Sequence, residues 1–122
     1  MEKNYEISEL LDFYGAVLTE KQREVIEQYY NDDLSLSEIA DNFGITRQGV
    51  RDAIKRGEAS MLELEAQMGV AKRYRTVQNA LTQLAGLAQN IRVTNETNYS
   101  YSKEIAGYAA QMQTILTELD KG

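Results

Sequence analysis

Apolar side chains recur at helical spacing through the first thirty residues, and they predict two short amphipathic helices. The first covers residues 7–14. The second begins after Thr19, whose hydroxyl can cap it while Gln22 completes a capping box. This helix runs to about Tyr30, and the polar residues 31–33 after it indicate a solvated turn rather than a metal site. The apolar positions of the two helices are Ile7, Leu10, Leu11, Tyr14, Val25, Ile26, Tyr29 and Tyr30.

The stretch Leu36–Lys55, LSEIADNFGITRQGVRDAIK, predicts two more helices that cross through a tight turn. The letters SLSE just before it match a capping box for the first of these helices. Ala40 supplies a small side chain where the helices cross. Gly44 can take the positive φ that the turn requires, and Thr46 can cap the second helix. We interpret this pattern as a helix-turn-helix in an all-α protein.

The second helix of this motif separates an apolar side from a polar side. Val50, Ala53 and Ile54 fall on the side that packs against the first helix. The opposite side carries side chains that can bond base edges and phosphates, and two interpretations remain open for it: DNA contact, or an ordinary solvated helix face. Asp52 lies on the same side and works against tight phosphate binding. The candidate DNA-binding residues are Thr46, Arg47, Gln48, Arg51, Lys55 and Arg56.

Beyond Lys55 the same helix is expected to continue, because Ile54, Gly57, Met61, Leu64 and Met68 follow one another at alternating three and four spacing. Gly57 inside this run either allows close helix approach or marks a bend. Gly69 is the expected end. We therefore place the helix-turn-helix domain at residues 1–69.

Residues 70–122 form a predicted C-terminal helical arm with two narrow apolar seams. A loop expected at residues 92–101 joins the two helices into an antiparallel hairpin. The seams can pair with each other, with another subunit or with another protein, and a homodimer is favoured because two linked half-sites raise affinity for DNA. The seam of the first helix contains Val77, Leu81, Leu84, Ala88 and Ile91, and the seam of the second contains Ile105, Tyr108, Met112, Ile115 and Leu119.

The absence of two residue types narrows the chemistry. The chain has no histidine and no cysteine, so the commonest general base, thiolate metal sites and disulfides are all missing. We assign no catalytic residue, no metal site and no cofactor, and we expect that the protein is not an enzyme. The amino terminus lacks the apolar core of a signal peptide, and the apolar runs are too short to span a bilayer. A cytoplasmic location without membrane insertion is therefore expected.

The net charge of −6 is unusual for a nucleic-acid partner, but the charge is unevenly divided. Residues 1–46 hold three basic residues against eleven acidic ones, net −8, whereas residues 47–75 hold seven against four, net +3. Residues 76–122 hold three against four, net −1. A second basic group, Lys72, Arg73 and Arg75 around Tyr74, is either a secondary nucleic-acid patch or a charged helix start.

The motifs FYG, LTEKQ, YYNDDLSLSEIA and RQGVRDAIKR together resemble the YlxM family of helix-turn-helix proteins, a family proposed to bind DNA. The resemblance covers residues 10–68, about half of the chain. More distantly, the same stretch resembles sigma-factor region four, which reads promoter DNA. Members of the family are typically encoded beside the signal recognition particle GTPase. The resemblance therefore implies a regulatory or accessory role in that pathway. Carried over by position, it also implies that Arg47, Gln48, Arg51 and Lys55 are the outward residues of the recognition helix.

Three functions follow from these observations. The first is a homodimeric DNA-binding regulator, which the resemblance connects with genes of the signal recognition particle pathway. The second is an accessory factor that binds the signal recognition particle protein or its RNA, for which the net charge and the polar tail argue. The third is a sigma-like partner of RNA polymerase.

Overall fold

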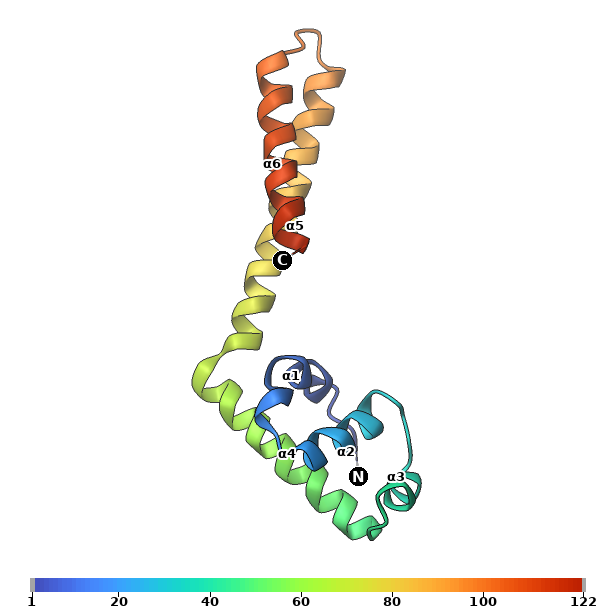
Figure 1. Cartoon of the computed structure of the whole chain (residues 1–122). Coiled ribbons are helices and arrows are strands. Elements are labelled where there is room, and N and C mark those ends of the chain that lie inside the picture. Colours follow the sequence, from blue (N-terminus) through green and yellow to red (C-terminus); the bar gives the residue numbers. More distant parts are fainter. Residues whose placement is uncertain (1, 122) are drawn as a thin grey trace. The chain divides into compact units, whose positions relative to one another are not determined.

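The computed structural model describes residues 2–121, and all regular structure within that range is helical (Figure 1). The all-α prediction is therefore confirmed. The chain divides into two compact units, one ending at Arg73 and one beginning at Tyr74. Across the described residues, no helix combines the length and hydropathy needed to cross a bilayer. The elements are α1 (Glu6–Tyr14), the 3-10 turn η1 (Gly15–Val17), α2 (Glu20–Tyr30), α3 (Leu36–Phe43), α4 (Arg47–Met68), α5 (Val70–Thr97) and α6 (Lys103–Lys121).

The starts of α2 and α3 are fixed by side chains close in sequence. Thr19 Oγ1 accepts from the backbone N–H of Gln22 at 3.1 Å, and the Gln22 side chain accepts from the backbone N–H of Thr19. Ser35 and Glu38 form the same reciprocal pair at the start of α3. Both capping boxes satisfy N–H groups that a helix leaves without partners. Both were expected from the sequence, and the structure confirms them.

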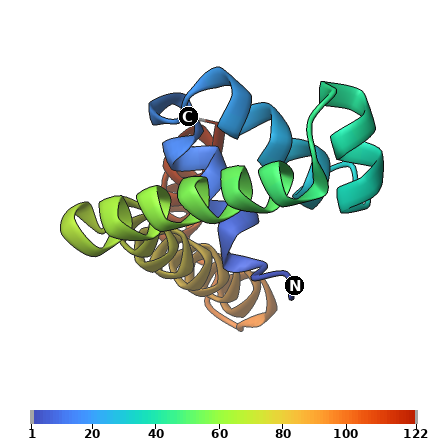
Figure 2. The same cartoon turned by 90° about the horizontal axis from the view of Figure 1, so that it is seen from below.

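The core of the first unit forms where α4 packs against α1, α2 and α3 (Figure 2). Ile7 and Leu10 from α1, Ile26 from α2, and Ile54 and Met61 from α4 have no exposed surface. Each of these branched or long apolar side chains contributes roughly 1.5–3 kcal/mol when it leaves water. The predicted apolar run along α4 continues inward as far as Leu64, which is half-buried.

The run does not continue to Met68, and here the prediction was wrong. The Met68 side chain is 62% exposed. Gly69 follows in the left-handed region at φ 62°, and α4 ends there as predicted. Because the chain turns away at this residue, the Met68 side chain stays outside the core of the first unit.

Tyr14 and Glu65, fifty-one residues apart, cap the start of α5. The Tyr14 hydroxyl donates to Glu65 Oε1 at 2.7 Å and accepts from the Val70 N–H at 3.2 Å. The two carboxylate oxygens of Glu65 then accept from the N–H groups of Ala71 and Lys72, each at 3.0 Å. Burial, followed by the hydrogen bond to Glu65, raises the pKa of Tyr14 above its ordinary value.

The second unit is a helical hairpin, in which α5 and α6 run side by side in opposite directions (Figure 1). The predicted loop at residues 92–101 was wrong in extent, because α5 continues to Thr97. No glycine or proline interrupts this stretch. The buried Asn95 instead closes the turn: its Nδ2 donates to the Ser102 carbonyl at 2.7 Å, and its Oδ1 accepts from the Ser102 N–H at 2.9 Å.

Of the pairings left open for the two predicted seams, pairing with each other inside the hairpin is only partial. Ala88 and Ala109 have no exposed surface. Their small side chains let the two helices approach closely. Tyr108, Ile115 and Leu119 were expected in the seam of α6, but they are 63%, 60% and 53% exposed. These larger side chains of the α6 seam are therefore not buried by α5, and their pairing with another chain stays a prediction.

Candidate nucleic-acid interface

The turn between α3 and α4 is closed by three residues. Gly44 takes φ 63° and ψ 36°, and its N–H reaches the Ala40 carbonyl, as does the Ile45 N–H at 3.1 Å. Thr46 then caps α4, because its Oγ1 accepts from the Gly49 N–H at 2.9 Å. The roles expected for Gly44 and Thr46 are thus the ones they have in the structure. A tightly fixed turn determines which side of α4 points outward.

The buried side chains of α4 show which side of the helix faces the core. Val50 and Ile54 have no exposed surface, Ala53 is half-buried, and Ala40 on α3 is 5% exposed. Four residues separate Val50 and Ile54, so they lie one above the other along the same face of the helix. Residues on the opposite side of the first two turns consequently point away from the core of this unit.

The predicted DNA-binding residues lie on or beside that outward side. Arg47, Gln48, Lys55 and Arg56 are exposed, and Arg51 is half-buried with its Nε enclosed and without a hydrogen-bond partner. Within residues 2–121 none of the four basic side chains in this group makes an ion pair. The Thr46 side chain is exposed, although its oxygen already caps the helix. The first turns of α4 thus present cations that are not neutralised by partners.

Two acidic contacts modify this surface. Gln48 Nε2 donates to Asp52 Oδ1 at 2.9 Å, one helical turn away. Lys55 borders a shallow surface depression whose lining also includes Glu2 and Glu58. Negative charge near Lys55 weakens its attraction for a phosphate. Residues 47–56 still carry four basic side chains against one acidic one, net +3.

The second basic group lies elsewhere along the chain. Lys72 and Arg73 are exposed in the first turn of α5, and the backbone N–H of Lys72 is held by Glu65. The length of α4 after Arg56 separates them from the first group by roughly 20 Å, at 1.5 Å per residue. Arg75 is exposed in the second unit, and both Lys72 and Arg75 have interactions with other side chains or backbone groups. Within the first unit, Lys72 and Arg73 therefore form a group separate from the basic residues at the start of α4.

A family model described as "Putative helix-turn-helix protein, YlxM / p13 like" (UPF0122) matches residues 1–106. The chain belongs to this family. The resemblance seen in the sequence is therefore confirmed.

Three UPF0122 relatives show the extent of the likeness. A protein of Thermoanaerobacter sp. (strain X514) is 48% identical over 75 residues, which are 62% of this chain and 64% of the relative. A protein of Acetivibrio thermocellus is 39% identical over 95 residues, 78% of this chain and 81% of the relative. One from Lacticaseibacillus casei is 42% identical over 89 residues, 73% and 79% of the two chains. The match thus spans less than two thirds of the Thermoanaerobacter protein.

Proposed function

We propose that this UPF0122 chain is a DNA-binding regulator that inserts the first turns of α4 into the major groove. One observation carries the proposal. A capped turn holds α4 with Val50 and Ile54 fully buried, while Arg47 and Gln48 on the other side are exposed. Arginine and glutamine are the side chains that make paired hydrogen bonds to guanine and adenine in the major groove. In helix-turn-helix proteins the N-terminal residues of the second helix reach the base edges.

The remaining cations have different roles in this proposal. Lys55 and Arg56 lie two to three turns farther along α4 and are suited to phosphates. Residues 1–46 carry net charge −8, which disfavours DNA at the surfaces that α1 and α2 form. DNA binding in this proposal depends on a few cations. Because their electrostatic contribution is small, it favours binding to selected sequences over binding to DNA in general. A homodimer would add a second α4 and a second half-site.

The first DNA to test follows from the resemblance to the YlxM family. Members are typically encoded beside the signal recognition particle GTPase, and we propose that this neighbourhood contains the regulated site. The second candidate function is an accessory factor for the signal recognition particle or its RNA. The acidic charge outside α4 supports it, because an acidic surface is suited to a protein partner with basic residues.

The test measures binding of the full chain by fluorescence anisotropy to duplexes that tile its own genomic neighbourhood. A shuffled duplex of equal composition and the signal recognition particle RNA are the competitors. We expect one duplex to be preferred at low salt, with affinity that falls steeply as salt rises. Preference for the RNA would establish the accessory role instead. Equal retention of every duplex would contradict the regulator proposal.

Two substitutions distinguish base contact from phosphate contact. Arg47→Ala should cost about 1–3 kcal/mol on the preferred duplex and relax its preference, whereas Lys55→Ala should weaken all duplexes and lower the salt dependence by about one ion. Lys21→Ala, an exposed lysine on α2, is the matched control and should change neither quantity. The same loss in Lys21→Ala as in Lys55→Ala would mean that only overall charge matters.

A further inference from the structure

One face of the α5–α6 hairpin carries large apolar side chains that the hairpin itself does not bury. They lie at helical spacing along both helices, so each helix has a continuous stripe. Their exposure ranges from 42% to 63%. The members of this apolar face are Val77, Leu84, Leu87 and Ile91 on α5, and Ile105, Tyr108, Ile115 and Leu119 on α6.

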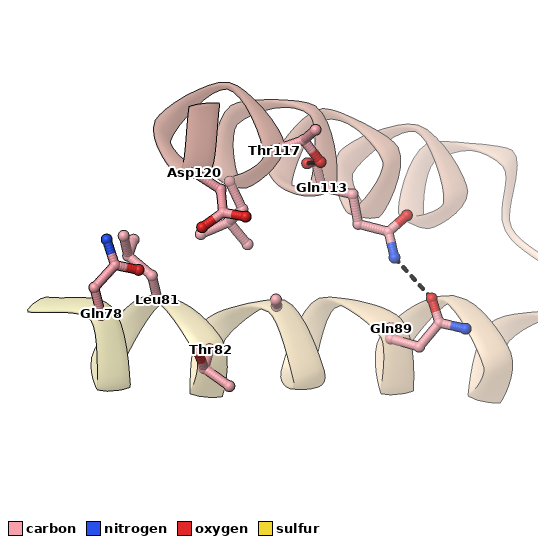
Figure 3. Close-up of a pocket in the computed structure, with 9 residues that line it drawn as sticks. Gln78, Leu81, Thr82, Gln89, Gln113, Thr117 and Asp120 are labelled. Atoms are coloured by element: carbon pink, nitrogen blue, oxygen red, sulfur yellow. Dashed lines mark hydrogen bonds between the residues drawn. The ribbon is translucent and has the colours of Figure 1, made fainter. Parts of the chain in front are cut away.

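The two stripes lie on the same side of the hairpin. A surface depression near the connecting loop is lined by Leu87 and Ile91 of α5 together with Ile105 of α6. The opposite side of the hairpin mixes polar side chains with smaller apolar contributions from Leu81, Ala85 and Leu116 (Figure 3). There Gln78, Thr82 and Gln89 of α5 face Gln113, Thr117 and Asp120 of α6, and Gln113 Nε2 donates to Gln89 Oε1 at 2.8 Å. The larger exposed apolar side chains of the hairpin therefore gather on one side, and polar groups are concentrated on the other.

We propose that the apolar face docks against the same face of a second copy of the chain and forms a four-helix bundle. Two facts about area support this. Half-exposed side chains of this size present on the order of 100 Å² each, so the eight together present roughly 800 Å². That is about the area each partner contributes to a stable protein–protein interface.

The chemistry of the border selects a second copy as the occupant. In a two-fold symmetric interface each patch meets itself, so a charged border would repel its own copy. Most polar residues beside the apolar stripes are uncharged, among them Asn90 and Thr94 on α5 and Gln111 and Thr114 on α6, while the exposed Glu104 lies one turn before Tyr108. A nucleic acid or a highly charged protein would find no counter-charge at these four positions. The face is self-complementary.

The test uses the full chain without DNA, so its outcome is separate from that of the DNA-binding proposal. Sedimentation velocity should show a species of twice 13.8 kDa at concentrations from about 1 to about 200 μM, with dissociation only at the lower end. A chain that stays at 13.8 kDa throughout would overturn the proposal.

Substitutions locate the interface. The double variant Leu87→Ala, Ile115→Ala should raise the dissociation constant roughly a hundredfold, at about tenfold for each substituted position counted over both copies. Its helical circular dichroism should persist, because both side chains are exposed in the single chain and alanine favours helix. Thr82→Ala, Thr117→Ala on the polar side is the matched control and should dimerise like the wild type.

A second variant, Tyr108→Ala, removes the most exposed side chain of the apolar face. It keeps the test informative if the double variant loses helix. It should weaken association at least about tenfold. A dimer that forms with wild-type affinity in these variants, or one that is weakened equally by the control, would show that another surface mediates association.

Discussion

Gly57 lies where α4 packs against α2, and its lack of a side chain leaves room for Ile26. A Cβ placed there would lie 2.3 Å from Cδ1 of Ile26. Ile26 has no exposed surface, so its end cannot swing into solvent. The two explanations that the sequence left open for Gly57 were close approach and a bend, and close approach is the one the contact supports.

Replacing Gly57 tests this contact. Gly57→Ala should lower the free energy of unfolding by about 1–2 kcal/mol, because overpacking costs about 1–3 kcal/mol and exceeds the gain of about 1 kcal/mol in helix propensity. Urea unfolding followed by circular dichroism measures the change. Gly86→Ala has open space around the new Cβ and should instead stabilise its helix by up to about 1 kcal/mol.

Ile26→Val removes the clashing methyl and completes a double-mutant cycle. In the Ile26→Val background, Gly57→Ala should cost clearly less than it does in the wild type. If the effects of the two substitutions on the free energy of unfolding are additive, the contact with Ile26 does not explain the glycine at position 57.

Tyr30 connects three segments of the first unit. Its hydroxyl donates to Glu58 Oε1 at 2.7 Å and accepts from the backbone N–H of Asn4 at 3.1 Å. Burial, followed by the bond to Glu58, raises the pKa of Tyr30 to about 12. Below the ordinary tyrosine pKa of about 10, the folded and unfolded chains both keep the proton, so this group adds no pH dependence.

Between these two values the unfolded chain releases the proton and the folded chain keeps it. Stability should therefore fall as the pH rises, by about 1–2 kcal/mol from this residue between about pH 9.5 and about pH 11.5. Urea unfolding at the two pH values should show a smaller loss for Tyr30→Phe than for the wild type. Tyr99→Phe alters a fully exposed ring and should lose as much as the wild type.

Among the elements, those set by neighbouring residues were predictable. The capping boxes at α2 and α3, the glycine turn and the end of α4 all rest on residues within about four positions of one another. The outward side of α4 followed from the same local spacing. The contacts between Tyr14 and Glu65, and between Asn95 and Ser102, leave no such pattern, because a pairing across a turn or across fifty residues has no fixed spacing.

The hairpin shows a second limit of sequence patterns. Each apolar stripe was visible, but the spacing of one helix does not state which edge of the stripe its neighbour covers. Ala88 and Ala109, the smallest apolar residues available, occupy the covered edge because they permit close approach. The larger residues remain beside it. The sequence left open what the two seams bind. In the structure this question concerns the apolar face of the α5–α6 hairpin.

The cap on α5 can be tested at the scale of the element. Glu65→Ala removes the acceptor of two backbone N–H groups, and it should cost about 1–2 kcal/mol of stability in the first unit. Hydrogen exchange should become faster at the amides of Ala71 and Lys72, while the amides in the middle of α4 keep their protection. Tyr14→Phe loses only its own hydroxyl contacts and should produce a smaller change.

Unchanged exchange at these two amides in Glu65→Ala would mean that water replaces the carboxylate at no cost. Exchange that rises equally throughout the unit would indicate global destabilisation rather than loss of a cap.

At the scale of the whole molecule, the proposed DNA binding would draw on few cations. One recognition surface carries four basic side chains, and the 46 residues before it carry net −8. A single copy therefore has a limited electrostatic contribution, since each phosphate contact releases about one counterion. Two copies joined through their hairpins would bind two half-sites with a high effective concentration for the second contact.

This coupling predicts how the hairpin variant behaves on DNA. Leu87→Ala, Ile115→Ala should bind a duplex with two half-sites at least about tenfold more weakly than the wild type, while binding to a single half-site stays the same. The slope of affinity against salt should also fall to about half on the longer duplex, because one recognition surface is engaged instead of two. Anisotropy titrations of both duplexes at several salt concentrations measure the two quantities. If variant and wild type bind the double site with equal affinity, dimerisation does not contribute to DNA binding, and each copy binds through its own α4 alone. A matching loss on the single half-site would instead mean that the hairpin substitutions disturb the first unit.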